Sequence, residues 1–342
     1  MIMSNKEKII EMMYKASTGI ANAVLVTLGI GLLLESFGNY LHWDVLLLVG
    51  GAAKVLLAPA LGAGIAYQLG GNSLVIFSAM ASSAVGGAAI QRSAEGAFTL
   101  VTGQPISAVI AGVIATYIGL KITGKTKLDI MAIPFAAVLI GGICGVYLAM
   151  VTTPLLNWIS GQITQSVQGS PLVGSMVLAI VFSILLMTPA SSAALAIALQ
   201  LDPVSSAAAL IGCTVQFVGF TVMSRKDNDL GGFLAQAIVT PKVQFPNLIK
   251  NPLYIIPPFV AAVISAPIAT MVFNLQVSYE LGGMGLSSLI APISILTGQG
   301  LKVFLIYVGV GMVLPGIITY VLHKGLKALG KVKAGDLHLE VQ

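Results

Sequence analysis

The chain has 342 residues, of which 57% are hydrophobic and only 8% charged, and its formal net charge is +5. A soluble domain carries about 25% charged residues, so there are too few charges here to cover a water-exposed globule. From Ile130 to Leu201 there is no Asp, Glu, Lys, Arg or His, whereas about 20 apolar residues already span a bilayer as one helix. The sequence therefore predicts an all-α, polytopic integral membrane protein. It excludes a soluble enzyme and a nucleic-acid-binding module.

Apolar runs separated by polar or charged residues predict eight membrane-crossing helices. They lie at about 18–35, 45–67, 73–90, 105–121, 130–152, 203–223, 253–274 and 302–322. A polar but uncharged loop is expected over 153–171, and a charged stretch covers 224–251.

Two further apolar runs, about 172–201 and 281–297, contain helix-breaking residues. Thr188-Pro189 interrupts the first run, and Pro removes a helix hydrogen bond. Gly282, Gly283 and Gly285 open the second. We expect both runs to be re-entrant helical hairpins, because non-helical backbone is tolerated at membrane depth where protein buries it or water reaches it.

The basic residues favour one topology. With both termini cytoplasmic and both hairpins re-entrant, 14 of the 17 basic residues lie on the inner side. If 172–201 crossed the membrane instead, parity would place the basic cluster 225–250 or the cluster 121–127 outside. The positive-inside rule disfavours that arrangement. We therefore expect a multi-pass protein of a bacterial-type cell membrane.

These elements predict three regions: an N-terminal scaffold half (1–125), a transport half (126–323) and a basic cytoplasmic tail (324–342). The order span–hairpin–span occurs twice, over 130–223 and 253–323. Internal repeats are common in transporters, although small-residue helix packing explains the shared Ser-Ser pairs equally well.

The hairpin breaks carry the strongest candidates for a solute site. Backbone groups freed by a broken helix need protein, water or ligand as partners, and transporters build midplane sites from such helices. For Ser and Gly the alternative is simple packing, for Gln216 it is a hydrogen bond between helices, and for Asn251 it is a helix cap. The candidate substrate-binding residues are Thr188, Ser191, Ser192, Gln216, Asn251, Glu280, Gly283 and Gly285.

Lys54 lies inside a predicted span, where a charge is costly and usually functional. It needs a carboxylate or backbone partner, for which Glu35, Glu95 and Glu280 are candidates, or else it snorkels to the interface. An alternative mouth for the pathway consists of Gln91, Arg92 and Glu95.

No cofactor and no metal site is expected, because Cys144 and Cys213 lie singly in apolar runs. The segment 119–126 fits the phosphate-loop pattern GxxxxGK[ST]. However, it follows a membrane helix rather than a strand, so we interpret it as a basic anchor that binds no nucleotide.

Five segments carry a resemblance to a known family: 124–130, 188–192, 212–220, 246–252 and 282–288. Together they resemble the PfoR-type membrane proteins, which are similar to the IIC component of the sugar phosphotransferase system. The resemblance implies a homodimeric transporter with a scaffold half and a mobile half that holds two hairpins. It also implies a cytoplasmic IIB partner. No phospho-acceptor His or Cys is expected in this chain, so any phosphotransfer needs that separate partner. Glu280 is the candidate for the substrate-binding glutamate of these relatives.

We therefore expect a carrier of phosphotransferase-IIC type that moves a small polar solute, a sugar or related compound, by alternating access. One alternative is a membrane-embedded ligand sensor or regulator that signals through 224–250. Another is an ion-coupled carrier in which Lys54 and a carboxylate relay protons.

Overall fold

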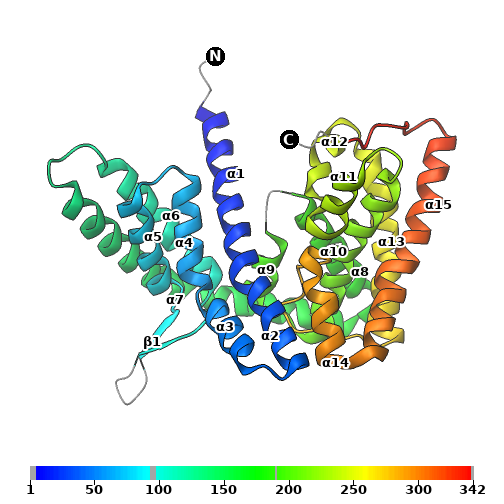
Figure 1. Ribbon diagram of the computed structural model, residues 1–342, viewed down its shortest axis with the longest axis horizontal. Coiled ribbons are helices and arrows are strands. Elements are labelled where there is room, and N and C mark those ends of the chain that lie inside the picture. Colours follow the sequence, from blue (N-terminus) through cyan, green and yellow to red (C-terminus); the bar gives the residue numbers. More distant parts are fainter. Residues whose placement is uncertain (1–4, 93–97, 189–190, 340–342) are drawn as a thin grey trace. The chain divides into compact units, whose positions relative to one another are not determined.

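The computed structural model describes residues 5–92, 98–188 and 191–339. The chain forms two compact units, an N-terminal unit (Met1–Trp158) and a C-terminal unit (Ile159–Gln342), whose elements are labelled in Figure 1. Helices make up most of both units, as the apolar composition predicts.

The N-terminal unit is a set of antiparallel helices with one short β-hairpin, whose strands pair Ile90 with Leu100 and Arg92 with Phe98. Helix α4 packs against α1, α5 and α6, and α2 packs against α3. The elements are α1 (Asn5–Val24), η1 (Leu25–Gly29), α2 (Ile30–Leu41), α3 (Asp44–Val55), α4 (Leu57–Gln68), α5 (Ser73–Gly86), β1 (Ile90–Arg92), β2 (Phe98–Leu100), α6 (Pro105–Ile122) and the first part of α7 (Asp129–Gly169).

Small residues let these helices approach closely. The Ser83 hydroxyl donates to the carbonyl of Ala108 on α6 at 2.8 Å, and the Ser82 hydroxyl donates to the carbonyl of Ala137 on α7 at 3.2 Å. Both serines are fully buried. Small residues and interhelical hydrogen bonds hold membrane helices together where no hydrophobic force acts between them. This Ser-Ser pair therefore has a packing role.

The run 45–67 is a helix pair rather than one straight span. Helices α3 and α4 meet at Leu56 with a bend of 58°. Leu56 has non-helical backbone angles, φ −82° and ψ 5°. Lys54 therefore lies in the last turn of α3, next to this break.

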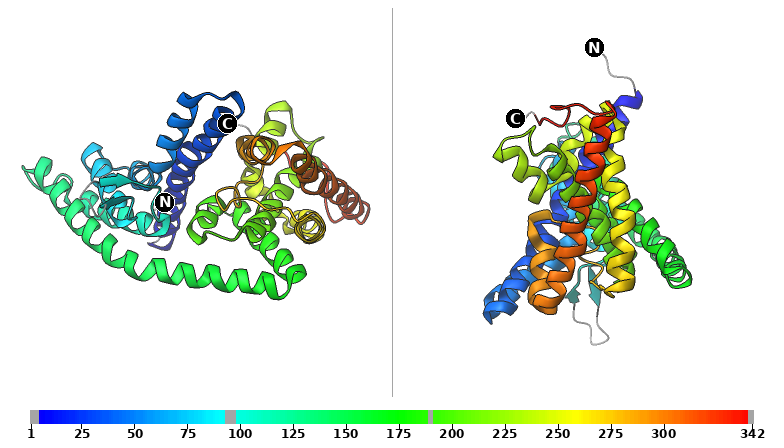
Figure 2. Two further views of the ribbon diagram at one scale, coloured as in Figure 1. Left: turned by 90° about the horizontal axis from the view of Figure 1, so that it is seen from below. Right: turned by 90° about the vertical axis from the view of Figure 1, so that its right-hand side faces the viewer.

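The C-terminal unit is built around α10, which packs against α8, α13 and α15. The most apolar window of α10 is 83% buried, compared with 22% for the run Ser287–Ala328. Figure 2 shows α13 and α15 side by side. The elements are α8 (Pro171–Met187), α9 (Ser192–Leu199), α10 (Pro203–Ser224), α11 (Leu230–Leu234), η2 (Ala235–Val239), η3 (Pro241–Gln244), α12 (Phe245–Lys250), η4 (Pro252–Ile255), α13 (Ile256–Pro267), η5 (Ile268–Val272), η6 (Ser287–Leu289), α14 (Ile290–Val308), η7 (Gly309–Val313) and α15 (Leu314–Ala328).

The loop predicted over 153–171 is wrong, because α7 continues to Gly169 with Pro154 inside it. One interior Pro removes a single backbone hydrogen bond, and the uncharged polar side chains that follow do not break a helix. The helix ends only where Pro171 begins α8, since the residue before a Pro is disfavoured in helical conformation.

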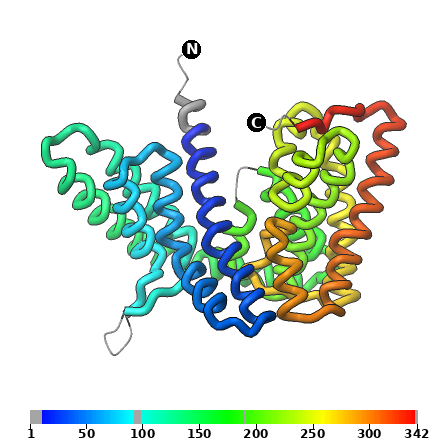
Figure 3. The backbone as a smooth tube through the Cα atoms, in the orientation of Figure 1, coloured from blue at the N-terminus to red at the C-terminus, as the bar shows by residue number. Residues whose placement is uncertain are grey.

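Both predicted hairpin runs contain a break. In the first, the cap residues Thr188 and Ser191, which end α8 and begin α9, have extended backbone. In the second, a non-helical stretch precedes η6 and α14, and Gly300 (φ 84°, ψ 174°) kinks the helix further on. The tube in Figure 3 shows the orange segment turning back at the lower edge of the view before it rises into α15.

Among the described residues, six helices are long and apolar enough to cross a membrane, or seven if α3 and α4 together count as one span. Three shorter apolar helices, Ser73–Gly86, Pro171–Met187 and Leu230–Val239, accompany them. The chain is thus a polytopic helical membrane protein.

Candidate functional site

The first break is a helix end followed by a new helix start. The Thr188 hydroxyl donates to the carbonyl of Leu185 at 2.9 Å, at the end of α8. The Ser191 hydroxyl accepts from the amide of Ala194 at 3.2 Å and caps α9. Ser191 therefore satisfies one of the free N–H groups of the half-helix start, while residues 189–190 lie outside the described ranges.

The second break is a buried stretch of irregular backbone, residues 279–286. It consists of consecutive turns, in which the amide of Gly282 donates to the carbonyl of Tyr279 at 3.2 Å and that of Met284 to Leu281 at 3.1 Å. Residues 281–286 are all buried, and Glu280 before them is half-buried. Enclosure by protein is the condition under which a membrane protein tolerates such backbone.

The two breaks lie against each other. The Ser192 hydroxyl, which is 3% exposed, donates to the carbonyl of Gly283 at 2.8 Å. A Cβ added to Gly283 would lie 2.5 Å from the amide nitrogen of Ala193, so only Gly fits this backbone-to-backbone contact. A side chain and a backbone carbonyl 91 residues apart in the sequence thus meet at one junction.

Helix α10 forms the wall next to this junction. Gly285 has φ +58°, and a Cβ there would lie 2.7 Å from the Phe217 ring. On the same turn of α10, Gln216 is fully buried, and neither of its amide atoms has a hydrogen-bond partner among the described residues. An unpartnered buried amide costs free energy, which makes Gln216 the polar group most in need of a ligand or water.

Lys242 is a residue that the sequence interpretation assigned only to the inner charge cluster. It lies in η3 and is half-buried. Desolvation by this burial lowers the pKa of Lys242. The sequence signal that could have singled it out is its neighbourhood: Lys242 is the only charged residue in a mostly apolar segment between Pro241 and Pro246. Arg225 and Lys226, in contrast, belong to a run of polar and charged residues.

The hydrogen bonds of Asn251 do not involve the residues of the junction. Its amide oxygen accepts from the amide of Leu253 at 3.2 Å and caps η4, and its amide nitrogen donates to the carbonyl of Lys331 at 3.1 Å. The capping role, one of the two alternatives for this residue, is therefore observed.

In the N-terminal unit, Lys54 has a carboxylate partner. Its Nζ lies 2.9 Å from Oε2 of Glu35, and the two side chains are 19% and 26% exposed. Gly31 and Gly50 make room for this pair, because a Cβ at Gly50 would lie 2.6 Å from the carbonyl oxygen of Gly31. The pair joins α2 to α3 next to the bend at Leu56.

The alternative mouth lies on the β-hairpin. Gln91 is exposed and Arg92 ends β1, whereas Glu95 lies outside the described ranges. This hairpin belongs to the N-terminal unit, as do Lys54 and Glu35.

The phosphate-loop pattern 119–126 joins α6 to α7 without a preceding strand. The Asp129 carboxylate accepts hydrogen bonds from the amides of Gly124 and Thr126 and from the Thr126 hydroxyl. A carboxylate therefore already occupies the backbone N–H groups that would have to bind a phosphate. Among the described residues, no group of three or more His, Cys, Asp or Glu is arranged for a metal ion.

The fold defines a multi-pass α-helical membrane protein in which two broken helical segments meet inside one unit. The family comparison specifies it further: the model of the phosphotransferase system EIIC family matches residues 14–339, so the chain belongs to that family. This confirms the resemblance seen in the sequence, and the protein is a membrane transporter of the phosphotransferase system. No curated protein matches the chain.

Proposed function

We propose that the protein carries a small polar solute, a sugar or related compound, across the cell membrane by alternating access, and that the solute binds at the junction of the two breaks. The contact between Ser192 and Gly283 carries this proposal, because it brings two stretches of irregular backbone together inside the apolar unit. Transporters use such discontinuous helices to form their binding sites.

The side chains at the junction suit hydroxyl groups. Gln216 offers an unused donor and an unused acceptor, and the Glu280 carboxylate accepts hydrogen bonds from hydroxyls. Thr188, Ser191 and Ser192 add short hydroxyls at the first break.

We further propose the topology that the basic residues favour: eight crossings, re-entrant hairpins at about 172–201 and 281–297, and cytoplasmic termini. In this scheme the transport half 126–323 moves against the scaffold half 1–125, two copies form a homodimer, and a cytoplasmic IIB protein supplies phosphate. Cysteine labelling at residue 336, in a background without the native cysteines, tests the orientation; modification only from outside contradicts it.

Uptake into proteoliposomes tests the site. Purified protein is assayed with radiolabelled hexoses, pentoses and hexitols, with and without a phosphorylated IIB partner. Removing one charged hydrogen-bond partner costs about 1.5–3 kcal/mol, or roughly ten- to a hundredfold in affinity. We expect this loss for Glu280→Gln, and a smaller one for Ser192→Ala.

Two matched variants control for unrelated damage. Ser78→Ala changes a buried serine of α5 in the N-terminal unit, and Glu11→Gln changes a surface carboxylate that pairs with Lys15. Both should transport like the parent. If Glu280→Gln and Ser192→Ala remain folded and also transport like the parent, the solute binds elsewhere.

The Lys54–Glu35 pair favours a second candidate, an ion-coupled carrier, since it is a charge pair on an apolar helix hairpin. Uptake driven by a proton gradient without IIB, and lost in Glu35→Gln, would support it. Uptake that requires phosphorylated IIB would exclude it.

A further inference from the structure

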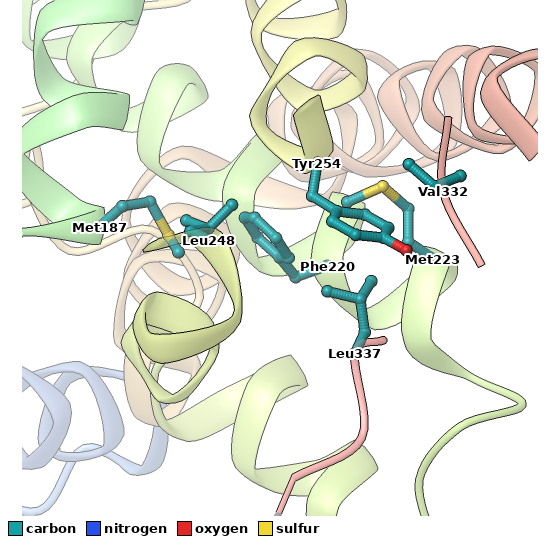
Figure 4. Packing of buried hydrophobic residues seen from close by; sticks show 7 residues of the cluster. All are labelled: Met187, Phe220, Met223, Leu248, Tyr254, Val332 and Leu337. Carbon is teal, nitrogen blue, oxygen red and sulfur yellow. The ribbon is translucent and has the colours of Figure 1, made fainter. Parts of the chain in front are cut away.

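The C-terminal segment of the protein, residues 329–339, lies along the ends of α10, α12 and α13 as a strap. Val332 and Leu337 are buried in an apolar cluster with Met187, Phe220 and Tyr254 (Figure 4). The other members of the cluster are Met223 and Leu248. The strap is therefore part of the core of the C-terminal unit.

Polar contacts hold the strap by its backbone. The carbonyl of Leu337 accepts from the side-chain amides of Asn228 and Gln244, both at 2.9 Å. The amide nitrogen of Asn251 donates to the carbonyl of Lys331, and the Tyr254 hydroxyl donates to the Asp336 carboxylate at 2.9 Å. None of these contacts uses a lysine side chain, so the strap is held without its lysine charges.

Between α12 and the strap lies a cavity of about 570 Å³. This volume is in the range of small-molecule sites. Lys250 contributes from α12, and Lys331 and Lys333 contribute from the strap. No ion pair of these three lysines is present among the described residues, although Asp336 also lines the cavity.

Asp336 offsets one of the three lysine charges, so the lining keeps a positive excess. Asp336 accepts from the Tyr254 hydroxyl and from the backbone amide of Lys333. Nδ1 of His338 lies 2.7 Å from the backbone carbonyl of Asp227. A carbonyl can only accept, so Nδ1 carries the hydrogen and donates it. Asn247 donates both amide hydrogens, to Gln244 and to the carbonyl of His338, which leaves its oxygen as an acceptor.

We propose that this cavity binds a phosphate-bearing anion. Three exposed lysines line one open cavity, lysines bind phosphate as point charges, and the volume exceeds what one phosphate group needs. The excess room and the free oxygen of Asn247 suit a small polar body with a hydroxyl attached to the phosphate. This site shares no residue with the junction at Ser192 and Gly283, so it stands or falls separately from the solute site.

Phosphate titration of the full-length protein in phosphatidylcholine nanodiscs tests the site. Inorganic phosphate and glycerol 3-phosphate are the probes, at constant ionic strength because salt screens exposed charges, with binding followed by calorimetry. We expect saturable binding that Lys250→Gln and Lys333→Gln each weaken about three- to tenfold. The matched control is Lys327→Gln, an exposed lysine of α15 that does not line the cavity, which should change affinity less than about twofold.

The absence of saturable binding would overturn the proposal, as would equal weakening by all three variants, which indicates diffuse surface charge. The source of the phosphate is decided by adding phosphatidylglycerol to the nanodiscs. If phosphatidylglycerol competes with inorganic phosphate and weakens its binding, the site takes a lipid headgroup. If inorganic phosphate binds as well as before, the site takes a soluble phosphate ester. Either result upholds the phosphate site.

Discussion

Replacing Gln216 with Leu should make the protein more stable while it impairs transport. The side chain is fully buried, and both amide atoms lack a partner among the described residues. Each unpartnered buried group costs about 1–3 kcal/mol. Leu has a similar volume, and imperfect repacking costs about 1 kcal/mol. The net expectation for Gln216→Leu is a gain of about 1–5 kcal/mol in the free energy of unfolding.

The matched control is Gln236→Leu. Gln236 is equally buried, but its amide group accepts from Ser224 and Gln244 and donates to the carbonyl of Gly232. The same substitution there strands three partners and should cost about 2–5 kcal/mol. If Gln216→Leu raises the free energy of unfolding and Gln236→Leu lowers it, the Gln216 amide has no partner in the empty protein and is available to bind a ligand.

Thermal and denaturant unfolding in detergent micelles measures both signs, and proteoliposome uptake measures function. A gain in stability together with lost uptake is typical of functional residues, which are not optimised for the empty protein. If Gln216→Leu destabilises the protein as much as Gln236→Leu does, Gln216 is hydrogen-bonded in the empty protein. It then serves as a link between helices, and the reasoning above is refuted.

Three further predictions follow from single contacts. In a double-mutant cycle, the double variant Lys54→Met/Glu35→Gln should lose about 1–3 kcal/mol less unfolding free energy than the two single variants lose in total, because each single change leaves the other charge without its partner. Strictly additive losses would mean that the pair does not form. Gly283→Ala should cost about 1–3 kcal/mol of unfolding free energy through overpacking. Gly298 has open space around it, so Gly298→Ala should be tolerated in the same unfolding assay. If both substitutions have similar effects, the close backbone contact at the junction is not present. The segment 119–126 should not bind ATP, so calorimetry should show no saturable ATP binding that depends on Lys125, and binding that disappears in Lys125→Ala would disprove this.

Sequence patterns alone predict the membrane class, most helices and the position of both breaks. Apolar runs of span length need no tertiary information, because the bilayer imposes the helix on any such run. Pro and Gly likewise act locally, so Thr188-Pro189 and Gly282-Gly283 indicate breaks by themselves. The same local reasoning fails over 153–169, where polarity suggests a loop and the backbone remains helical.

Contacts between distant residues are decided only by the tertiary structure. Glu35, and not another carboxylate, pairs with Lys54 because Gly31 and Gly50 let α2 and α3 approach. Ser192 meets Gly283 across 91 residues, and Asn251 binds the strap through Lys331. A sequence pattern shows which residues can hydrogen-bond or break a helix. Which of them become partners depends on helix packing, since an ion pair or hydrogen bond forms only when the folded backbones bring its atoms within about 3 Å.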